Sequence, residues 1–161
     1  MLKRIYIKDY ILLDNVEVFF KKGLNVITGE TGAGKSILID ALNMVLGERA
    51  SSGNIRKGSQ TAKIEGEFHI LSDKVISRFL HLEGMDLSSK NIHLKREITQ
   101  RGKSRSYINN VGISITAMKE IGDYLVDMHG QHEHQSLLKI ERHIEFLDNF
   151  AGTLELLSRV K

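Results

Sequence analysis

The chain has 161 residues, 41% of them hydrophobic, and a formal net charge of +3. This length suits one domain, or one lobe of a larger one, with enough apolar residues for a packed core. The absence of cysteine excludes disulfides and thiolate metal sites, and no apolar run approaches the roughly 20 residues of a membrane-spanning helix. The weakly positive charge permits contact with nucleic acid without requiring it, and the start lacks the apolar core of a signal peptide, so we expect a cytoplasmic protein.

The first predicted elements are strands, over residues 2–7 and 15–20, where apolar side chains alternate with polar ones. The apolar run over residues 24–28 is typical of a strand buried on both faces. After a glycine-rich turn, apolar residues recur at helical spacing over residues 37–46, and Gly47 stands where a helix ends. The pattern is therefore strand, turn and helix.

The second half changes in style. Residues 62–70 alternate cleanly between apolar and polar side chains, which indicates a half-buried strand of an antiparallel sheet. A helix is predicted over residues 72–84, capped by Ser72. The remaining predicted elements are two strands at 91–98 and 104–109 joined by a hairpin turn, a helix at 116–125, a brief strand at 125–128, and an amphipathic helix from Leu137 onward.

The turn after residues 24–28 carries the chemistry, because it matches the phosphate-loop pattern G-x-x-x-x-G-K-[ST]. Its glycines let backbone N–H groups approach phosphate oxygens, and the following helix points its positive end at the anion. Lys35 supplies a charge for the β- and γ-phosphates, and Ser36 a hydroxyl for Mg²⁺. The motif predicts a nucleoside triphosphate site formed by Gly29, Glu30, Thr31, Gly32, Ala33, Gly34, Lys35 and Ser36.

Hydrolysis also needs a carboxylate that helps to hold Mg²⁺ and a group that orients water. Asp127, after Leu125 and Val126, is the local candidate, although capping a strand end is the simpler role for it. One reading is therefore a compact small-molecule or nucleotide kinase that uses Asp127 for Mg²⁺. The short apolar run before Asp127 and a tail helix without a stop signal count against it.

Several segments resemble a known family. The opening "LKRIYIKDYILLDNVEVFFKKGLNVITGETGAGKS" resembles SMC-type ATPase heads, an ABC-like class. Together with "LGERASSGNIRKGS", "GKSRSYINN" and "VDMHGQHEHQSLL", it resembles the RecN family of bacterial DNA repair proteins, from about residue 2 to residue 152. The resemblance implies an α/β P-loop NTPase fold: the N-terminal lobe of an ABC/SMC-type head, with a mixed core sheet and an antiparallel β subdomain.

The same resemblance implies two parts, residues 1–136 with the phosphate loop and Q-loop, and residues 137–161 as a helical segment that leads into a coiled coil. The family's signature motif and Walker B carboxylates are not found in the chain, so we expect only the N-terminal lobe. The implied function is the ATP-binding lobe of an SMC-like ATPase in double-strand break repair and recombination. The implied cofactors are ATP and Mg²⁺, and the implied partners are its own C-terminal lobe, a second head in a homodimer, and DNA, with no membrane. The expected location is the cytoplasm, at the nucleoid, and the chain alone should bind ATP but hardly turn it over.

Residue by residue, Gln131 matches the Q-loop glutamine that contacts Mg²⁺ and the attacking water, with Gln135 as the alternative. Arg56 lies where SMC-type heads place an arginine near nucleotide and DNA, with Arg49 as the alternative. A solvated loop charge is the simpler reading of either arginine.

A histidine cluster and a basic patch each allow a functional and a simpler interpretation. The histidines His129, His132 and His134 resemble a metal cluster, but the Q-loop match already accounts for the segment. The densest basic patch predicts salt-dependent DNA contact, against the simpler reading of a solvated face. Its residues are Lys95, Arg96, Arg101, Lys103 and Arg105.

Overall fold

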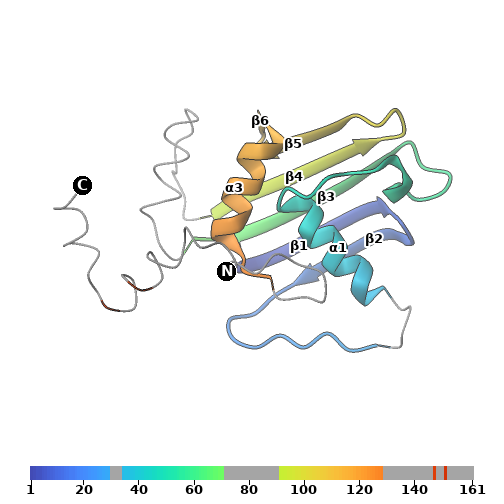
Figure 1. Cartoon of the computed structure of the whole chain (residues 1–161). Helices are drawn as coiled ribbons and strands as arrows, with labels where there is room; N and C mark the ends of the chain where they lie inside the picture. The colour runs from blue at the N-terminus through green and yellow to red at the C-terminus, as the bar shows by residue number, and fades with distance from the viewer. Residues whose placement is uncertain (30–33, 71–90, 129–146, 148–150, 152–161) are drawn as a thin grey trace. The chain divides into compact units, whose positions relative to one another are not determined.

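The computed structural model describes residues 1–29, 34–70, 91–128, 147 and 151. The chain divides into two units, Met1–Leu125 and Val126–Lys161. All helices and strands described below lie in the first unit (Figure 1). The boundary predicted after residue 136 lies outside the described residues and stays a prediction.

An antiparallel sheet forms the body of the first unit. Its strands lie in the order β2-β1-β3-β4-β5-β6, and every neighbouring pair is antiparallel. The elements in chain order are β1 (Leu2–Tyr10), β2 (Leu13–Phe19), α1 (Lys35–Val45), the short 3-10 helix η1 (Ser52–Asn54), β3 (Thr61–His69), β4 (Asn91–Thr99), β5 (Ser104–Ile108), β6 (Val111–Ile113) and α3 (Ile115–Leu125).

The two central strands follow from their alternation. In β3 and β4 every second side chain is buried, and the register places Ala62 opposite Ile98 and Phe68 opposite Ile92. Because successive side chains of a strand point to opposite faces, one face of the pair is apolar apart from Arg96 and the other is charged. This confirms the predicted strands and the hairpin between β4 and β5.

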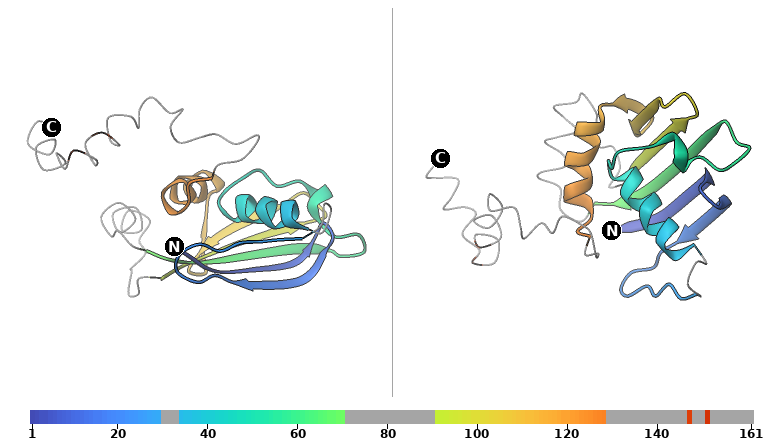
Figure 2. Two further views of the ribbon diagram at one scale, coloured as in Figure 1. Left: turned by 90° about the horizontal axis from the view of Figure 1, so that it is seen from below. Right: turned by 45° about the vertical axis from the view of Figure 1, so that its right-hand side comes forward.

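Both helices cover the apolar face of the sheet (Figure 2). The buried residues of α1 are Ala41, Met44 and Val45, and α1 contacts β1, β3 and β4, whereas α3 contacts β5. The two helices meet where α1 ends. A Cβ on Gly122 of α3 would overlap the Leu46 carbonyl oxygen, so only glycine permits this approach.

The predicted strand over residues 24–28 is not formed. These residues belong to no strand, and the exposed fractions are 92% for Leu24, 72% for Val26 and 44% for Ile27. The physical reason is that a buried strand needs neighbours on both edges, and no strand among the described residues pairs with this one. The α/β class is confirmed, but the described strands make no parallel pairing of the kind a mixed sheet needs.

Two further details, at residues 126–128 and at β6, differ from expectation. Residues 126–128 form no strand, whereas a short β6 that the alternation did not predict pairs with β5. The β5–β6 turn consists of Asn109 and Asn110, with positive φ values of 45° and 69°. Asn109 also extends the sheet, because its N–H donates to the His93 carbonyl and its Oδ1 accepts from the His93 N–H, both at 2.9 Å.

The helix predicted over residues 72–84 and the tail helix from Leu137 lie outside the described residues.

Candidate nucleotide site

The end of the phosphate loop forms the start of α1. Gly34 is the N-cap residue, with φ 92° and ψ 0°, a left-handed conformation that other residues adopt only at a cost. It carries no side-chain cap for the first turn of the helix, and no acidic residue lies in that turn. The first-turn N–H groups and the positive end of the helix dipole are therefore presented to an anion without a competing carboxylate in that turn.

Lys35 reaches back along the loop. Its Nζ donates a hydrogen bond to the carbonyl oxygen of Gly29, so the ammonium group lies near the first glycine of the motif. Ser36 is exposed at the first turn of α1. A lysine ammonium group and a hydroxyl at the N-terminus of one helix are the groups that hold a triphosphate and its Mg²⁺. The described part of the motif, Gly29 and residues 34–36, thus fits a nucleotide.

The start of β2 lies beside this helix start. A Cβ built on Gly34 would lie 3.6 Å from Cδ2 of Leu13. The next residue, Asp14, pairs with Arg56 at 3.0 Å between Oδ1 and Nη1. The backbone N–H of Arg56 donates a hydrogen bond to the Asp9 carbonyl at 2.9 Å, and Tyr10 and Ile55 form an isolated β-bridge. Sequence spacing gave no reason to expect that these contacts would fix Arg56 to the β1–β2 hairpin, whose Leu13 lies beside Gly34.

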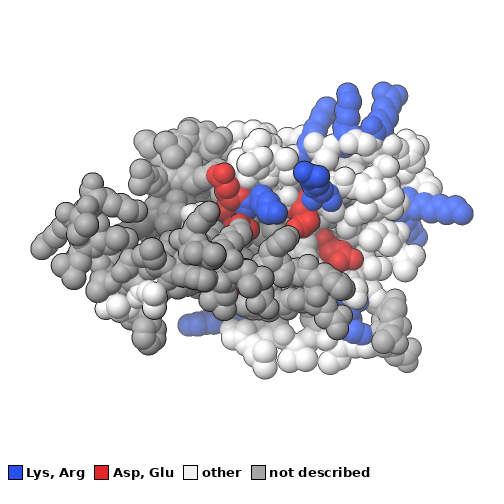
Figure 3. Space-filling model, viewed as in Figure 1, with Lys and Arg blue, Asp and Glu red and all other residues white. Residues whose placement is uncertain are grey.

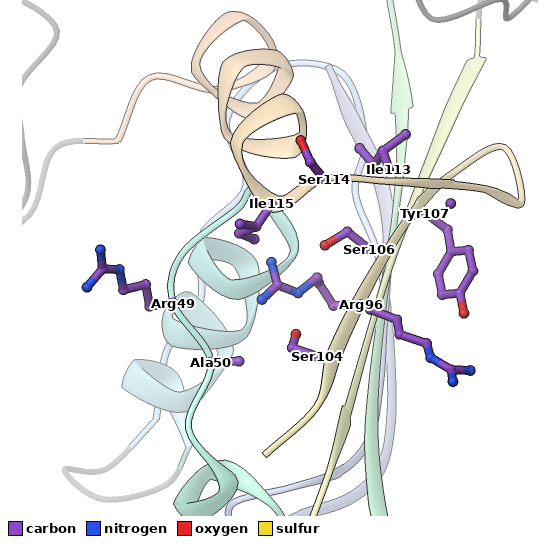
Figure 4. A pocket seen from close by; sticks show the side chains of 11 residues that line it. Arg49, Ala50, Arg96, Ser104, Ser106, Tyr107, Ile113, Ser114 and Ile115 are labelled. Carbon is purple, nitrogen blue, oxygen red and sulfur yellow. The ribbon is translucent and has the colours of Figure 1, made fainter. Parts of the chain in front are cut away.

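The rival arginine, Arg49, lies elsewhere. It is exposed and lines a pocket of about 720 Å³ between the segment after α1, the strands β4 to β6 and the start of α3 (Figure 4). Of the two candidates, only Arg56 is bonded, among the described contacts, to the β1–β2 hairpin that lies beside the phosphate loop.

The predicted basic patch divides into three parts. Arg96 is only 2% exposed, because the alternation of β4 places it on the face that packs under the helices. It therefore does not belong to the outer surface, which corrects the grouping of the five residues. Lys95 lies on the outer face, where its Nζ is 3.2 Å from Oε1 of Glu97 and 4.2 Å from the centre of the Tyr107 ring.

The other three members, Arg101, Lys103 and Arg105, are exposed. They lie at or beside the β4–β5 turn. Lys and Arg side chains project from the edge of the molecule that carries this hairpin in Figure 1 (Figure 3).

Asp127 is exposed and follows α3 rather than a buried strand, so nothing in its placement favours the kinase reading. The remaining predicted site residues lie outside the described residues: Glu30, Thr31, Gly32, Ala33, Gln131, Gln135, His129, His132 and His134. Among the described residues, no group of His, Cys, Asp and Glu could hold a metal ion. No helix in the described part of the chain is long and apolar enough to cross a membrane.

Comparison with protein families matches residues 4–153 to the model described as an AAA domain. The chain is 41% identical to the DNA repair protein RecN of Bacillus subtilis (strain 168) over 152 residues, which is 94% of this chain and 26% of that protein. It is 46% identical to RecN of Halalkalibacterium halodurans over 154 residues, 94% of this chain and 27% of that protein. The chain thus spans little more than a quarter of these curated relatives, and the predicted resemblance to RecN is confirmed.

Solved structures share the fold. A chain from work on ATP-driven dimerization and DNA-stimulated activation of SMC ATPases matches with TM-score 0.61 and 21% identity, over 91% of this chain and 98% of that one. The SMC head domain from Thermotoga maritima matches with TM-score 0.55 and 23% identity, over 74% of this chain and 41% of that one. The recombination mediator RecF with ATP matches with TM-score 0.55 and 17% identity, over 70% of this chain and 27% of that one.

Proposed function

The chain belongs to the AAA domain family, and on that premise we propose that it is the ATP-binding lobe of an SMC-like ATPase that acts in DNA double-strand break repair and recombination. The RecN relatives, which are DNA repair proteins, and the fold shared with SMC heads support this function. Such a protein works in the cytoplasm, at the nucleoid. The observation that carries the proposal is the left-handed Gly34 at the start of α1 with Lys35 folded over Gly29.

In this proposal the loop binds and orients ATP rather than cleaving it. Backbone N–H groups of the loop and the N-terminus of α1 surround the phosphates, and Lys35 contacts the β- and γ-phosphates. Ser36 and the Q-loop glutamine, Gln131 or its rival Gln135, hold Mg²⁺, which neutralises charge that develops during phosphoryl transfer. Arg56, fixed by Asp14 beside the loop, approaches the same nucleotide.

Hydrolysis, by this proposal, requires the C-terminal lobe of the same protein. The exposed apolar residues 24–28 support this. Their composition is typical of a buried strand, but among the described residues no strand covers Leu24 and Val26. Two complete heads would then enclose ATP between them. Because the γ-phosphate contacts both heads, it favours the closed homodimer over separate heads.

The first test measures affinity for Mg·ATP by titration calorimetry. Lys35→Ala should weaken binding about 10–100-fold, the range expected for losing hydrogen bonds from a charged group. Lys119→Ala, which removes an exposed lysine of α3, is the matched control and should leave the affinity unchanged. Equal affinities of the parent chain and the Lys35 variant would rule out nucleotide binding at this loop.

The second test measures ATP turnover by the chain with and without a separately expressed C-terminal lobe. The chain alone should be close to background, the mixture should hydrolyse ATP, and Lys35→Ala should abolish the activity of the mixture. Brisk turnover by the chain alone, lost in Lys35→Ala, would show that the catalytic centre is complete without the other lobe and would refute this part of the proposal.

We also propose that Arg101, Lys103 and Arg105 form a DNA-contacting surface at the β4–β5 hairpin. Their exposure supports it, whereas Lys95 is engaged by Glu97 and Tyr107. The double variant Lys103→Ala/Arg105→Ala should weaken DNA binding and reduce the slope of log affinity against log salt by about 1–2. Lys95→Ala is the control and should leave the slope unchanged. An unchanged slope in the double variant would remove this surface from DNA binding.

A further inference from the structure

A pocket lies on the helix-covered side of the sheet, away from the phosphate loop. Its volume is about 720 Å³, and its walls include the inner face of β4 and β5, the start of α3 and the segment after α1 (Figure 4). Ala50, in one wall, follows the C-terminal end of α1, whereas the phosphate loop precedes its N-terminal end. A helix of 11 residues spans about 16 Å, so the pocket and the loop lie at opposite ends of α1.

The side chain of Arg96 enters this pocket from β4. Its guanidinium group lies between Ser104 and Ser106 in Figure 4 and points away from the strand toward the helices. Arg96 is 2% exposed, and its Nε and Nη1 atoms are buried without a hydrogen-bond partner in the part of the chain that the structure describes. Donors of an ionised group are rarely buried unpaired, because neither water nor protein then replaces their hydration.

Arg96 remains a cation under ordinary conditions. Burial lowers its pKa from the ordinary value of an arginine to about 10, which still leaves it protonated at neutral pH. The strand neighbours on its own face are Leu94 and Ile98, and the residues opposite it are Ile64 and Ser106, so these positions provide no compensating carboxylate. The described residues that line the pocket include no Asp or Glu. The pocket therefore favours an anion and disfavours a metal cation.

The other polar groups indicate which anion fits. Ser104 and Ser106 place hydroxyls on either side of the guanidinium (Figure 4). Ser114 and Ile115 bring the N-terminus of α3 to the pocket, and Ser114 Oγ already accepts from the Ala117 N–H at 3.0 Å. Hydrogen-bond donors thus come from the Arg96 guanidinium and from the two serines on its two sides, and the helix end adds the positive end of its dipole. A phosphate has enough oxygens to meet donors from three directions, whereas a carboxylate has two oxygens in one plane.

We propose that the Arg96 pocket is a second anion site of this protein, one that binds a phosphate group, either as inorganic phosphate or as a backbone phosphate of nucleic acid. Arg96 provides the paired donors, Ser104 and Ser106 provide hydroxyls, and the N-terminus of α3 provides a positive dipole. The exposed Arg49, which also lines the pocket, adds a further positive charge beside it.

The test measures the thermal unfolding midpoint of the chain against inorganic phosphate, with sodium chloride adjusted to keep ionic strength constant. Every sample carries Lys35→Ala, so that the phosphate loop contributes little. Saturating phosphate should raise the midpoint of this background by about 3–6 °C. Adding Arg96→Met should remove that rise. General stabilisation by phosphate as a salt affects both proteins equally, so the difference between them isolates the pocket.

Arg96→Met is expected to fold, because it replaces an unpaired buried charge with an apolar side chain of similar length. A milder variant, Ser106→Ala, keeps Arg96 and should weaken phosphate binding about 10-fold through the loss of one hydrogen bond to a charged group. If Arg96→Met shows the same phosphate-dependent rise as its parent, the proposal is wrong. The same holds if the rise is absent from both.

A second arm identifies the source of the phosphate. A short single-stranded oligonucleotide without terminal phosphates is titrated against the same pair of proteins by fluorescence anisotropy. Weaker binding by Arg96→Met, together with loss of the phosphate effect, assigns the pocket to backbone phosphate. Unchanged oligonucleotide binding with loss of the phosphate effect assigns it to free phosphate. Both results support the site.

Discussion

The antiparallel sheet and the segment over residues 24–28 are both rich in apolar residues, but the structure buries one and exposes the other. Ile64 and Phe68 of β3 are fully buried, whereas Leu24 is 92% exposed and Val26 is 72% exposed. Strand β3 has β1 on one edge, β4 on the other, and α1 on its apolar face. Residues 24–28 have no strand neighbour among the described residues.

This difference shows that apolar composition alone does not decide burial. A strand is stabilised by neighbours that complete its hydrogen bonds and cover its side chains, and those neighbours come from other parts of the chain. For β3, these neighbouring strands and the covering helix all belong to the first unit. By our proposal, the neighbours of residues 24–28 belong to the C-terminal lobe. The expected effects of substitutions in the two regions differ accordingly.

The largest effect should come from the buried centre of the sheet. Phe68→Ala should lower the free energy of unfolding by about 3–5 kcal/mol, because it leaves a cavity where a fully buried ring was. Its neighbour Glu67→Ala, on the outer face, is the control and should change the stability by less than about 0.5 kcal/mol. Urea denaturation followed by circular dichroism measures both. A loss below 1 kcal/mol for Phe68→Ala would mean that the sheet is not the stable body of the unit.

The next effect concerns the contact between the helices that cover the sheet. Gly122→Ala should destabilise the protein by about 1–3 kcal/mol, because the added Cβ meets the Leu46 carbonyl. In an exposed helix the same change would stabilise by about 1 kcal/mol, so the sign of the effect is diagnostic. Glu120→Ala, at an exposed position of α3, is the control. A stabilising Gly122→Ala, in the same denaturation assay, would show that α3 does not pack closely against the end of α1.

A smaller, pH-dependent effect is expected on the outer face. Burial raises the pKa of Glu65. The hydrogen bond from Lys63 and the nearby His93 lower this pKa by more than burial raises it, so the net pKa lies below the ordinary 4.5. A carboxyl whose pKa is lower in the folded state stabilises the fold at any pH above its unfolded-state pKa. This contribution is lost as the pH falls through the folded-state pKa. Glu65→Gln should therefore cost up to about 1 kcal/mol at pH 7.

That loss should shrink as the pH falls through the folded-state pKa of Glu65, because the carboxyl then becomes protonated in the parent as well. Thermal unfolding of both proteins between pH 3 and pH 7 provides the measurement. Glu67→Gln, whose nearest cation is Arg4 at 3.8 Å, is the matched control with a smaller expected effect. A pH-independent difference between Glu65→Gln and the parent would mean that the ion pairs around Glu65 do not contribute.

The smallest effect belongs to the exposed segment. Leu24→Ser/Val26→Ser should change the stability of the isolated chain by less than about 0.5 kcal/mol, because both side chains are already exposed to water. The same variant should lose binding to a separately expressed C-terminal lobe in an analytical gel-filtration assay. A large loss of stability in the chain alone would show that residues 24–28 are buried within it, and the comparison would fail.

These regions also mark how far the sequence could predict the structure. Local signals sufficed where the cause was local: the alternation of β3, the helical spacing of α1 and the glycines of the phosphate loop. The strand over residues 24–28 failed because strand formation depends on distant neighbours. Arg96 was grouped with Lys95 because they are adjacent in sequence, although the two-residue period of β4 places it among Ile92, Leu94 and Ile98. The contact between Asp14 and Arg56 could not be predicted, because it depends on tertiary packing.

The turn at Asn109 has a consequence for how this protein can vary. The position needs a residue that tolerates a left-handed backbone and whose side chain also carries an oxygen that can accept from the His93 N–H. Glycine meets the first demand only, and glutamine the second only, so asparagine and aspartate are the residues that meet both. In a saturation library selected for folding, position 109 should therefore retain only asparagine and aspartate. The neighbouring position 110, which needs only a left-handed backbone, should also accept glycine.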